Sequence, residues 1–253
     1  MAISFNEVSQ EIEDILKSLD KQLQLSFYLS NSENCFSFHG NRVMPSASLI
    51  KLMIADYYCS NFSLTDLQKQ TQKTSQSVGG SGVIQILDQK VLSLSDLISM
   101  MLSLSDNTAA NTLIDIVGLN SLSVWIKGHY SATSLSRKFM DFSQKKDNLT
   151  DANDAAHALR RLIEFPLTKR ALFKQQSTNK FELNFVESNN QKINFYNKTG
   201  EGSGIDHDAI IFRHQNRQIV AVLMTKYDPA IESRLEIINL FSEIGDLLKE
   251  SIL

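Results

Sequence analysis

Hydrophobic positions near both ends of the chain recur at helical spacing, next to segments with strand patterns. Apolar residues in 5–19 recur every three or four positions, which predicts an amphipathic helix, and the same spacing predicts a C-terminal helix over 230–252. Runs of β-branched and aromatic residues favour strands. Such runs occupy residues 23–29, 35–40, 192–200, 208–215 and 217–227.

The middle of the chain has a helical pattern almost throughout. Between residues 45 and 180, segments such as LSDLISMMLSL and DANDAAHALRRLIEF place apolar residues at helical spacing, as does SLTDLQKQTQ over 63–72. The economical assembly is an α+β fold with an antiparallel five-stranded sheet, formed by both ends of the chain and flanked by the terminal helices. We therefore predict a discontinuous α/β lobe of residues 1–44 and 181–253, and an all-helical lobe of residues 45–180.

Composition and charge exclude several classes of partner. The 253 residues include 25 Lys and Arg against 28 Asp and Glu, a net charge of -3, and no arginine-rich block, so we expect no nucleic-acid partner. No run approaches the roughly 18 apolar residues of a transmembrane segment. The acidic, amphipathic N-terminus does not have the pattern of a signal peptide, but a chain trimmed of its signal would look the same, so the compartment stays open. We expect a monomer that needs no metal or cofactor.

Two minor features have structural interpretations. The chain has two cysteines, Cys35 and Cys59, and the sequence does not decide whether they pair; two buried thiols are the simpler interpretation. The glycine-dense stretch SVGGSG, residues 77–82, lacks the strand and lysine of a phosphate-binding loop. We expect it to be a plain loop.

The stretch PSASLIKLMIADYYC places one lysine, Lys51, in a run of apolar residues. Ser48 lies three positions earlier, so on a helix the two side chains share one face and the amine reaches the hydroxyl. Burial lowers the pKa of a lysine, and a neutral amine can accept the proton of a serine hydroxyl. A salt-bridged or partly solvated lysine is the structural alternative. The chemical interpretation is that Lys51 activates Ser48.

Two further motifs indicate that the pair of Ser48 and Lys51 is not a chance match. SxxK occurs four times, beginning at Ser18, Ser48, Ser143 and Ser177, and among these only Ser48 begins an apolar helix. SDN occurs once, at residues 105–107 between two predicted helices, and KTG occurs once, at residues 198–200 at the end of a predicted strand. Each tripeptide alone is typical of a cap or turn. All three motifs in this order favour one active site.

With these motifs the sequence resembles the class A β-lactamases and the related penicillin-binding proteins, whose signature is SxxK, SDN and KTG. The resemblance covers nearly the whole chain and implies a β-lactamase/transpeptidase-like fold. It implies that Ser48 is the acylated nucleophile and Lys51 its proton acceptor. Ser105 would pass a proton to the departing nitrogen. Lys198 would bind the carboxylate that such substrates carry.

The resemblance also implies a substrate-binding set, made of Asn107, Thr199, Gly200 and Glu201. Asn107 would position the lysine and hold a substrate amide, and Thr199 would help to bind the carboxylate. Gly200 would let an extended substrate approach the strand edge. The backbone amides of Ser48 and Glu201 would form the oxyanion hole. Glu201 departs from the family, which usually has a small residue at this position.

The loop that carries the deacylation base in class A β-lactamases is different here. In the family an arginine is followed two residues later by a glutamate that holds the hydrolytic water, and four residues after that by an asparagine. Aligning Arg137 with that arginine puts Phe139 at the glutamate position and Ser143 at the asparagine position. The usual base is therefore missing, or another residue such as Asp141 replaces it; a solvated loop residue is the alternative for Asp141.

Three functions remain open on this sequence. The first is a serine acyl hydrolase of the β-lactamase family, acylated at Ser48 by β-lactams or related acyl-amides, with slow or atypical deacylation. The second is a penicillin-binding-protein-like D-Ala-D-Ala peptidase or esterase. The third is a non-catalytic binder of muropeptides or β-lactams. All three imply a small-molecule β-lactam or peptidoglycan-like acyl ligand.

Overall fold

The computed structural model describes residues 4–69, 74–88, 91–184 and 193–252. At its centre is a five-stranded antiparallel sheet in the order β2-β1-β7-β6-β5, so both ends of the chain contribute to one sheet. The strands span Gln24–Ser30 (β1), Cys35–Phe38 (β2), Asn194–Gly202 (β5), Ile205–His214 (β6) and Arg217–Lys226 (β7). The predicted α+β fold is confirmed, and β5, which carries KTG, is an edge strand.

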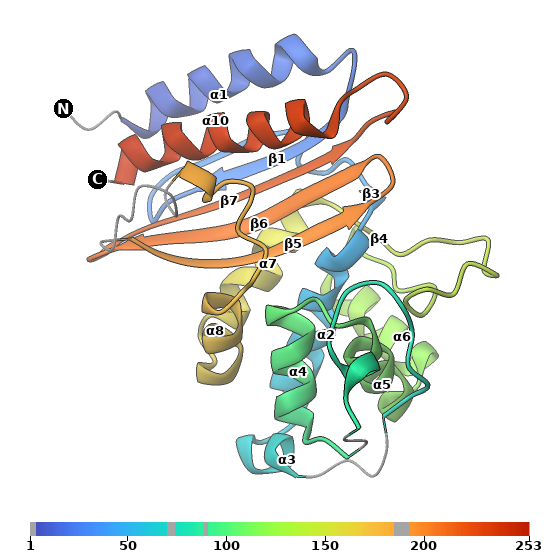
Figure 1. Cartoon of the computed structure of the whole chain (residues 1–253). Coiled ribbons are helices and arrows are strands. Elements are labelled where there is room, and N and C mark those ends of the chain that lie inside the picture. The colour runs from blue at the N-terminus through green and yellow to red at the C-terminus, as the bar shows by residue number, and fades with distance from the viewer. Residues whose placement is uncertain (1–3, 70–73, 89–90, 185–192, 253) are drawn as a thin grey trace.

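Two helices from the ends of the chain cover one face of the sheet. Figure 1 shows α1 (Phe5–Leu19) and α10 (Arg234–Ile252) side by side above the strands. At the start of α1 the Ser4 hydroxyl accepts the Glu7 N–H, while the Glu7 carboxylate accepts the Ser4 N–H, which is a capping box. The apolar sides of both helices pack with the sheet in one buried cluster that includes Ile12, Phe212 and Phe241.

The central strands are buried on both faces. Along β6, Ile210 and Phe212 join the cluster under the terminal helices, whereas Ala209 and Ile211 join the cluster of the helical lobe. Successive side chains of a strand point to opposite faces of a sheet. This is why β6 has a continuous apolar run in the sequence and not an alternating one.

The helical lobe packs against the opposite face of the sheet, mainly through α7 (Figure 1). Its helices are α2 (Ile50–Asn61), α3 (Leu64–Gln68), α4 (Leu94–Ser103), α5 (Asn107–Val117), α6 (Leu119–His129), α7 (Ala152–Leu162) and α8 (Pro166–Phe173), with short strands β3 (Met44–Pro45) and β4 (Leu149–Thr150). α2 is buried nearly all round, which explains its apolar composition. The predicted helix over 63–72 is shorter, and residues 70–72 lie outside the described residues.

The two cysteines lie in different environments. Both cysteines are free, but Cys35 lies exposed at the start of the edge strand β2, so the prediction of two buried thiols is wrong for that residue and holds only for Cys59.

Within the described ranges no single helix is long and apolar enough to cross a membrane. Helices α5 and α6 reach that length and composition only as a pair bent by 94°.

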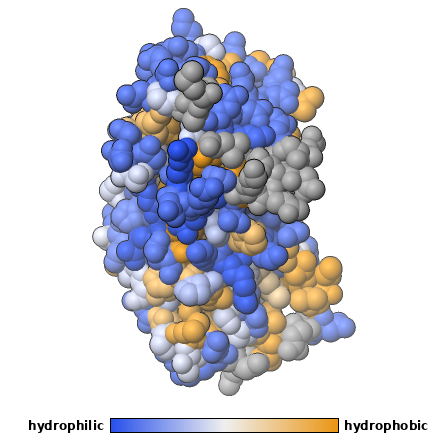
Figure 2. Space-filling view, turned by 90° about the vertical axis from the view of Figure 1, so that its left-hand side faces the viewer, coloured by the Kyte–Doolittle hydropathy of each residue, from blue (hydrophilic) through white to orange (hydrophobic). Residues whose placement is uncertain are grey.

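One face of the molecule, shown in Figure 2, is largely hydrophilic over the sheet layer and carries larger hydrophobic groups lower down, over the helical lobe. The exposed large apolar side chains of this lobe lie on several different elements. They include Leu64 on α3, Ile116 on α5 and Val124 on α6. Scattered exposed apolar side chains of this kind are ordinary for a folded protein.

Gly245 lets α10 approach the segment that leads into β5. A Cβ at this position would collide with the carbonyl group of Phe181. We expect Gly245→Ala to destabilise the fold by about 1–3 kcal/mol, the usual cost of overpacking, although alanine gains up to about 1 kcal/mol in helix propensity. Urea unfolding followed by circular dichroism measures this free energy.

Gly128 near the end of α6 is the matched control, because a Cβ there meets nothing within 4 Å. Gly128→Ala therefore gains helix propensity without a collision, and its free energy of unfolding should rise by up to about 1 kcal/mol. Equal effects of the two substitutions would show that the approach of α10 to Phe181 is not tight.

Candidate active site

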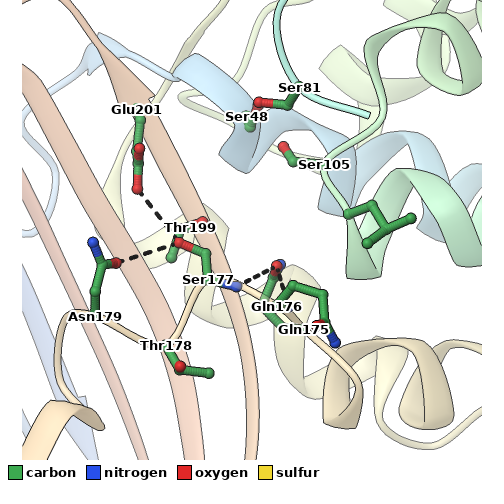
Figure 3. Close-up of a pocket in the computed structure, with 11 residues that line it drawn as sticks. Ser48, Ser81, Ser105, Gln175, Gln176, Ser177, Thr178, Asn179, Thr199 and Glu201 are labelled. Carbon is green, nitrogen blue, oxygen red and sulfur yellow. Dashed lines mark hydrogen bonds between the residues drawn. The ribbon is translucent and has the colours of Figure 1, made fainter. Parts of the chain in front are cut away.

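Two neighbouring hollows, of about 460 and 430 Å³, lie between the sheet edge and the helical lobe. Ser48, Ser81 and Glu201 line both of them. We call the first the Ser105 hollow; its wall continues with Leu104, Ser105, Thr199 and residues 175–179, and Figure 3 shows its polar side chains converging. We call the second the Phe139 hollow; its wall includes Asn107, Phe139, Met140 and Phe142.

Ser48 lies at the point where β3 leads into the helical lobe. It is the central residue of a short 3₁₀ helix, Ala47–Leu49, that continues into α2. The preceding residue, Ala47, has φ of 44°, in the left-handed region that L-residues with a side chain rarely adopt. Ser105 (φ 53°) and Met140 (φ 63°) share this property and also line the hollows. Backbone strain of this kind concentrates at functional sites.

Lys51 is fully buried, and its amine contacts Ser48 and the SDN loop. Its Nζ lies 3.1 Å from Ser48 Oγ, 2.6 Å from the Ser105 carbonyl oxygen and 2.8 Å from Asn107 Oδ1. It is also 3.2 Å from Ser105 Oγ. The predicted pairing of Ser48 with Lys51 is therefore present in the structure, together with both outer residues of the SDN motif.

Burial holds the pKa of Lys51 well below its usual range, and the charge of Lys198 lowers this pKa further, while Asp106 opposes the shift. A neutral amine has two N–H donors and one lone pair. The carbonyl oxygen of Ser105 and Oδ1 of Asn107 can only accept, so they take the two donors. The lone pair is then left for the Ser48 hydroxyl, which is the arrangement that a general base requires.

Lys198 connects the KTG strand to the SDN loop. Its Nζ donates to Ser105 Oγ at 3.2 Å and to the Thr199 carbonyl oxygen at 2.8 Å. Burial lowers the pKa of Lys198 to about 7, while the nearby Asp208 raises it. Ser105 Oγ thus lies between two buried amines, which suits a hydroxyl that passes a proton.

The SDN loop is fixed by contacts that the sequence did not predict. The Asp106 carboxylate caps α5 at Ala109 and also accepts the backbone N–H groups of Val83 and Ile84. Asn107 Nδ2 donates to the Gly79 carbonyl oxygen. The stretch 77–82 is indeed a loop, but it brings Ser81 to the wall of both hollows. The sequence predicts a plain loop for this stretch but not the position of Ser81 in the site.

Gly200 and His207 bring the sheet edge close to Ser48. A Cβ at Gly200 would lie 3.2 Å from the Ser46 carbonyl oxygen and 3.3 Å from the His207 ring, so glycine allows this approach. His207 Nε2 lies 2.8 Å from the Pro45 carbonyl oxygen, and Nδ1 accepts the Thr225 N–H at 3.1 Å. His207 therefore connects β6 and β7 to the segment before Ser48, a role that sequence reasoning missed.

Glu201 extends the KTG strand, and its side chain is held by cations. Its carboxylate is 2.6 Å from Lys180 Nζ and 3.0 Å from the Arg234 guanidinium. Burial would raise the pKa of Glu201, but Lys180 and then Arg234 outweigh that effect and lower it. Glu201 is thus a fixed anion at the boundary of the two hollows.

Phe139 occupies the wall beside Lys51. The centre of its ring is 4.2 Å from Lys51 Nζ, and its side chain is 9% exposed. The amide of Asn111 clamps its backbone, with Oδ1 accepting the Phe139 N–H and Nδ2 donating to its carbonyl oxygen. Phe139, which the alignment puts at the glutamate position of the family, therefore lies beside Lys51 in the structure.

Asp141 and Ser143 lie farther along the same loop. The Asp141 carboxylate accepts from the backbone N–H and hydroxyl of Ser143, and these bonds lower the pKa of Asp141. Neither residue belongs to the described walls of the two hollows. The role of Asp141 as a base stays a prediction. In the described part of the chain, no group of three or more His, Cys, Asp and Glu residues is arranged to hold a metal ion.

The chain resembles a known protein family and several solved structures. The model of the β-lactamase enzyme family matches residues 7–252. A search of curated proteins finds no match. Among solved structures, a β-lactamase from Sphaerobacter thermophilus is similar at 23% identity with a TM-score of 0.79, covering 99% of this chain and 97% of the other.

Two further structures show the same fold. The protein PBP-A has 18% identity and a TM-score of 0.79, with 98% of this chain and 97% of the other covered. A class A β-lactamase from Mycobacterium abscessus has 17% identity and a TM-score of 0.76, with 96% and 98% covered. A mutant of PBP-A, equally similar in identity, was solved as an acyl-enzyme complex with penicillin G. The β-lactamase/transpeptidase-like fold expected from the motifs is confirmed.

The burial of His207 predicts a pH dependence of stability. Burial lowers the pKa of His207 from 6.5 to about 4. Between these values the unfolded chain binds a proton at His207 and the folded protein does not, so acid favours unfolding. The contribution of His207 should fall by about 3 kcal/mol as the pH drops from 7 to 4.

A comparison of wild type with His207→Gln isolates this effect from the other titrating groups. The stability difference between the two proteins should shrink as the pH falls from 7 towards 5, with urea unfolding as the measurement. NMR of the imidazole should show a neutral ring over the same interval. A ring that protonates near pH 6.5 in the folded protein would refute the inference.

Proposed function

The chain belongs to the β-lactamase enzyme family, and from this premise we propose that this serine hydrolase is acylated at Ser48 by β-lactams and related acyl-amides or esters, and that its acyl-enzyme hydrolyses slowly. The observation that carries the proposal is the pair of groups around Ser48. On one side lies Lys51, which is fully buried and whose pKa burial holds well below its usual range. On the other side of this amine lies the ring of Phe139.

Acylation follows from the contacts of Lys51. Its amine takes the Ser48 proton while Oγ attacks the carbonyl carbon, and negative charge develops on the carbonyl oxygen. In this proposal the backbone amides of Ser48 and Glu201 stabilise that oxyanion. Ser105 then gives its proton to the departing atom and regains one from the Lys51 ammonium, 3.2 Å away. The bond to the leaving group breaks and the acyl ester at Ser48 remains.

Deacylation lacks the glutamate base that the resemblance to class A β-lactamases would supply, because Phe139 aligns with that position. A water molecule attacking the ester needs a base, and general-base help is typically worth about 10²- to 10⁴-fold in rate. Phe139 has no proton-accepting atom, and its ring packs against Lys51. The two carboxylates that line the Phe139 hollow are each held in an ion pair, Asp147 with Arg137 and Glu201 with Lys180. These contacts support a long-lived acyl-enzyme.

A D-Ala-D-Ala peptidase or esterase is the second candidate. The wall formed by Phe139 is compatible with this activity. A site without a deacylation base can still transfer an acyl group when the leaving group departs from the site and water enters in its place. Non-catalytic binding is the weaker candidate, since Ser48, Lys51 and Ser105 form a connected set of proton donors and acceptors.

Ser48→Ala tests the acylation site. Intact mass spectrometry after mixing with penicillin G should show a covalent adduct on wild type and none on the variant, and turnover of a reactive ester should fall by a factor on the order of 10⁶. Ser18→Ala, at an exposed SxxK serine, is the control and should acylate like wild type. An adduct that survives in Ser48→Ala would contradict the proposal.

Phe139→Glu tests the deacylation step. A carboxylate in this wall can activate water, so decay of the penicilloyl adduct should accelerate, by up to about 10²- to 10⁴-fold. Phe139→Ala opens space for water without adding a base and should accelerate decay much less. Phe142→Glu adds the same charge on an exposed neighbour in the same hollow and should leave decay unchanged.

Stability has to be checked first, because replacing a packed phenylalanine costs about 3–5 kcal/mol. Circular dichroism and thermal unfolding establish which variants are folded. An unchanged decay rate in folded Phe139→Glu would mean that the ring does not occupy the position of a base, or that Asp141 or another group already serves as one.

A further inference from the structure

The Ser105 hollow has an unusual wall for a site that is expected to receive a carboxylate. Its described lining consists of hydroxyl and amide side chains, one leucine and a single charged residue, Glu201 (Figure 3). Ser105 would protonate the leaving group, so this hollow holds the leaving-group side of the substrate. The one charged side chain in the described lining of this hollow is therefore an anion.

The cations nearest to Glu201 are already neutralised. Lys180 is fully buried and lies 2.6 Å from Glu201 and 3.4 Å from Asp206. Arg234 contacts the same two carboxylates, each at 3.0 Å. Two cations and two anions form a closed network, and Ser177 Oγ adds a hydrogen bond to Glu201 at 3.4 Å. This network has no net charge, and it fixes the Glu201 carboxylate on the wall while both cations are paired with carboxylates.

Lys198 does not compensate fully for Glu201. It is fully buried, it is not among the lining residues, and it donates to Ser105 Oγ and to the Thr199 carbonyl oxygen. Burial lowers the pKa of Lys198 to about 7, so at neutral pH this amine carries only part of a charge. An anionic leaving group meets a fixed carboxylate at the wall and a partly charged amine behind it.

We propose that Glu201 is a specificity-determining residue that makes the Ser105 hollow accept neutral, hydrogen-bonding leaving groups, such as amides or alcohols, in preference to carboxylates. This inference rests on the proposed acylation of Ser48. It changes the task expected for Lys198, which then supports Ser105 more than it binds a substrate carboxylate. Penicillins, which carry a carboxylate, still acylate Ser48 but react more slowly than matched neutral substrates.

The side chains of the wall fit a neutral ligand. Thr199 and Asn179 offer hydroxyl and amide groups, and the backbone between Gln175 and Ser177 is held in place by the Gln175 amide oxygen, which accepts the N–H groups of Gln176 and Ser177. Hydroxyl and amide groups both donate and accept, so they can pair with an uncharged polar group without a counterion. A carboxylate in the same place would lose water and gain a like charge as its neighbour.

The test uses two esters of phenylacetylglycine that differ only in the leaving group. One releases 3-hydroxybenzamide, which is neutral, and the other releases 3-hydroxybenzoate, which is anionic. Release of the phenol in the first turnover at pH 7 gives the second-order acylation rate constant for each ester. The ratio of the neutral to the anionic rate constant measures the discrimination, and wild type should favour the neutral ester.

Glu201→Gln removes the negative charge and leaves Arg234 and Lys180 with only Asp206 as an anionic partner. The ratio should fall on the order of tenfold, mainly because the anionic ester reacts faster. Glu201→Asp keeps the charge and should keep a ratio near that of wild type. Glu232→Gln makes the same change of charge and type two residues from Arg234, away from the described walls of the hollows, and should leave the ratio unchanged.

A measurement on wild type alone covers the case in which Glu201→Gln does not fold. Raising the ionic strength from about 0.01 to 0.5 M shortens the Debye length from about 30 Å to a few ångströms. Repulsion by Glu201 at this partly exposed wall is then screened, and the ratio should fall towards that of the intrinsic reactivity of the two esters. A ratio that does not change with salt would overturn the inference.

The outcomes separate the two proposals. If neither ester acylates Ser48, the proposed function is wrong and this inference falls with it. If both esters acylate Ser48, but folded Glu201→Gln keeps the wild-type ratio, then the function stands and the role of Glu201 is wrong. A lower ratio in Glu201→Gln, with unchanged ratios in Glu201→Asp and Glu232→Gln, is the result that supports it.

Discussion

The burial of Lys51 is the constraint on which the rest of the site depends. An ammonium in the interior costs several kcal/mol unless it is paired, and within the described part of the chain the hydrogen-bond partners of this lysine are hydroxyl, carbonyl and amide oxygens. Burial lowers the pKa of Lys51 and so favours the neutral amine, whose two N–H groups can be donated to the Ser105 carbonyl oxygen and to Asn107. The apolar run of α2, the strained turn at Ser105 and the ring of Phe139 all maintain that state, because each one excludes water or supplies an acceptor. Loss of any of them changes how readily Ser48 gives up its proton.

A carboxyl group on the opposite face of the sheet influences the pKa of Lys198. Asp208 is buried on β6 beneath Lys198, and it raises the pKa of Lys198 against the effect of burial. Burial raises the pKa of Asp208 itself to about 6, and burial together with the neighbouring Asp208 raises that of Glu182. Asn197 donates to Glu182 at 2.7 Å and lies 3.4 Å from Asp208. A carboxyl pair that retains one proton carries a single charge, which is enough to influence Lys198 without burying two anions.

Much of the fold and of the catalytic set was predictable because it depends on local pattern. The apolar periods gave both terminal helices and the strands, and the three motifs gave Ser48, Lys51, Ser105 and Lys198, which the structure brings together. The residues that hold the segments of the site in place were missed by sequence analysis. Asn111 clamps the loop and His207 connects the sheet to the segment before Ser48, yet each is an ordinary polar residue in an apolar element whose partner is distant in sequence. The exposure of Cys35 also depends on β2 being an edge strand, which no local pattern specifies.

The ring of Phe139 and the carboxylate of Glu201 affect different steps of the proposed acylation and deacylation of Ser48. In the proposed reaction Phe139 lies beside the amine that starts acylation, and its ring offers no proton acceptor for the water that would attack the ester in the second step. Glu201 lies where the two hollows meet, and in our proposal it acts on the leaving group before the first step is complete. The proposed long-lived acyl-enzyme and the proposed preference for neutral leaving groups can therefore be tested separately. A change at one position should alter the lifetime of the ester, and a change at the other should alter which esters form.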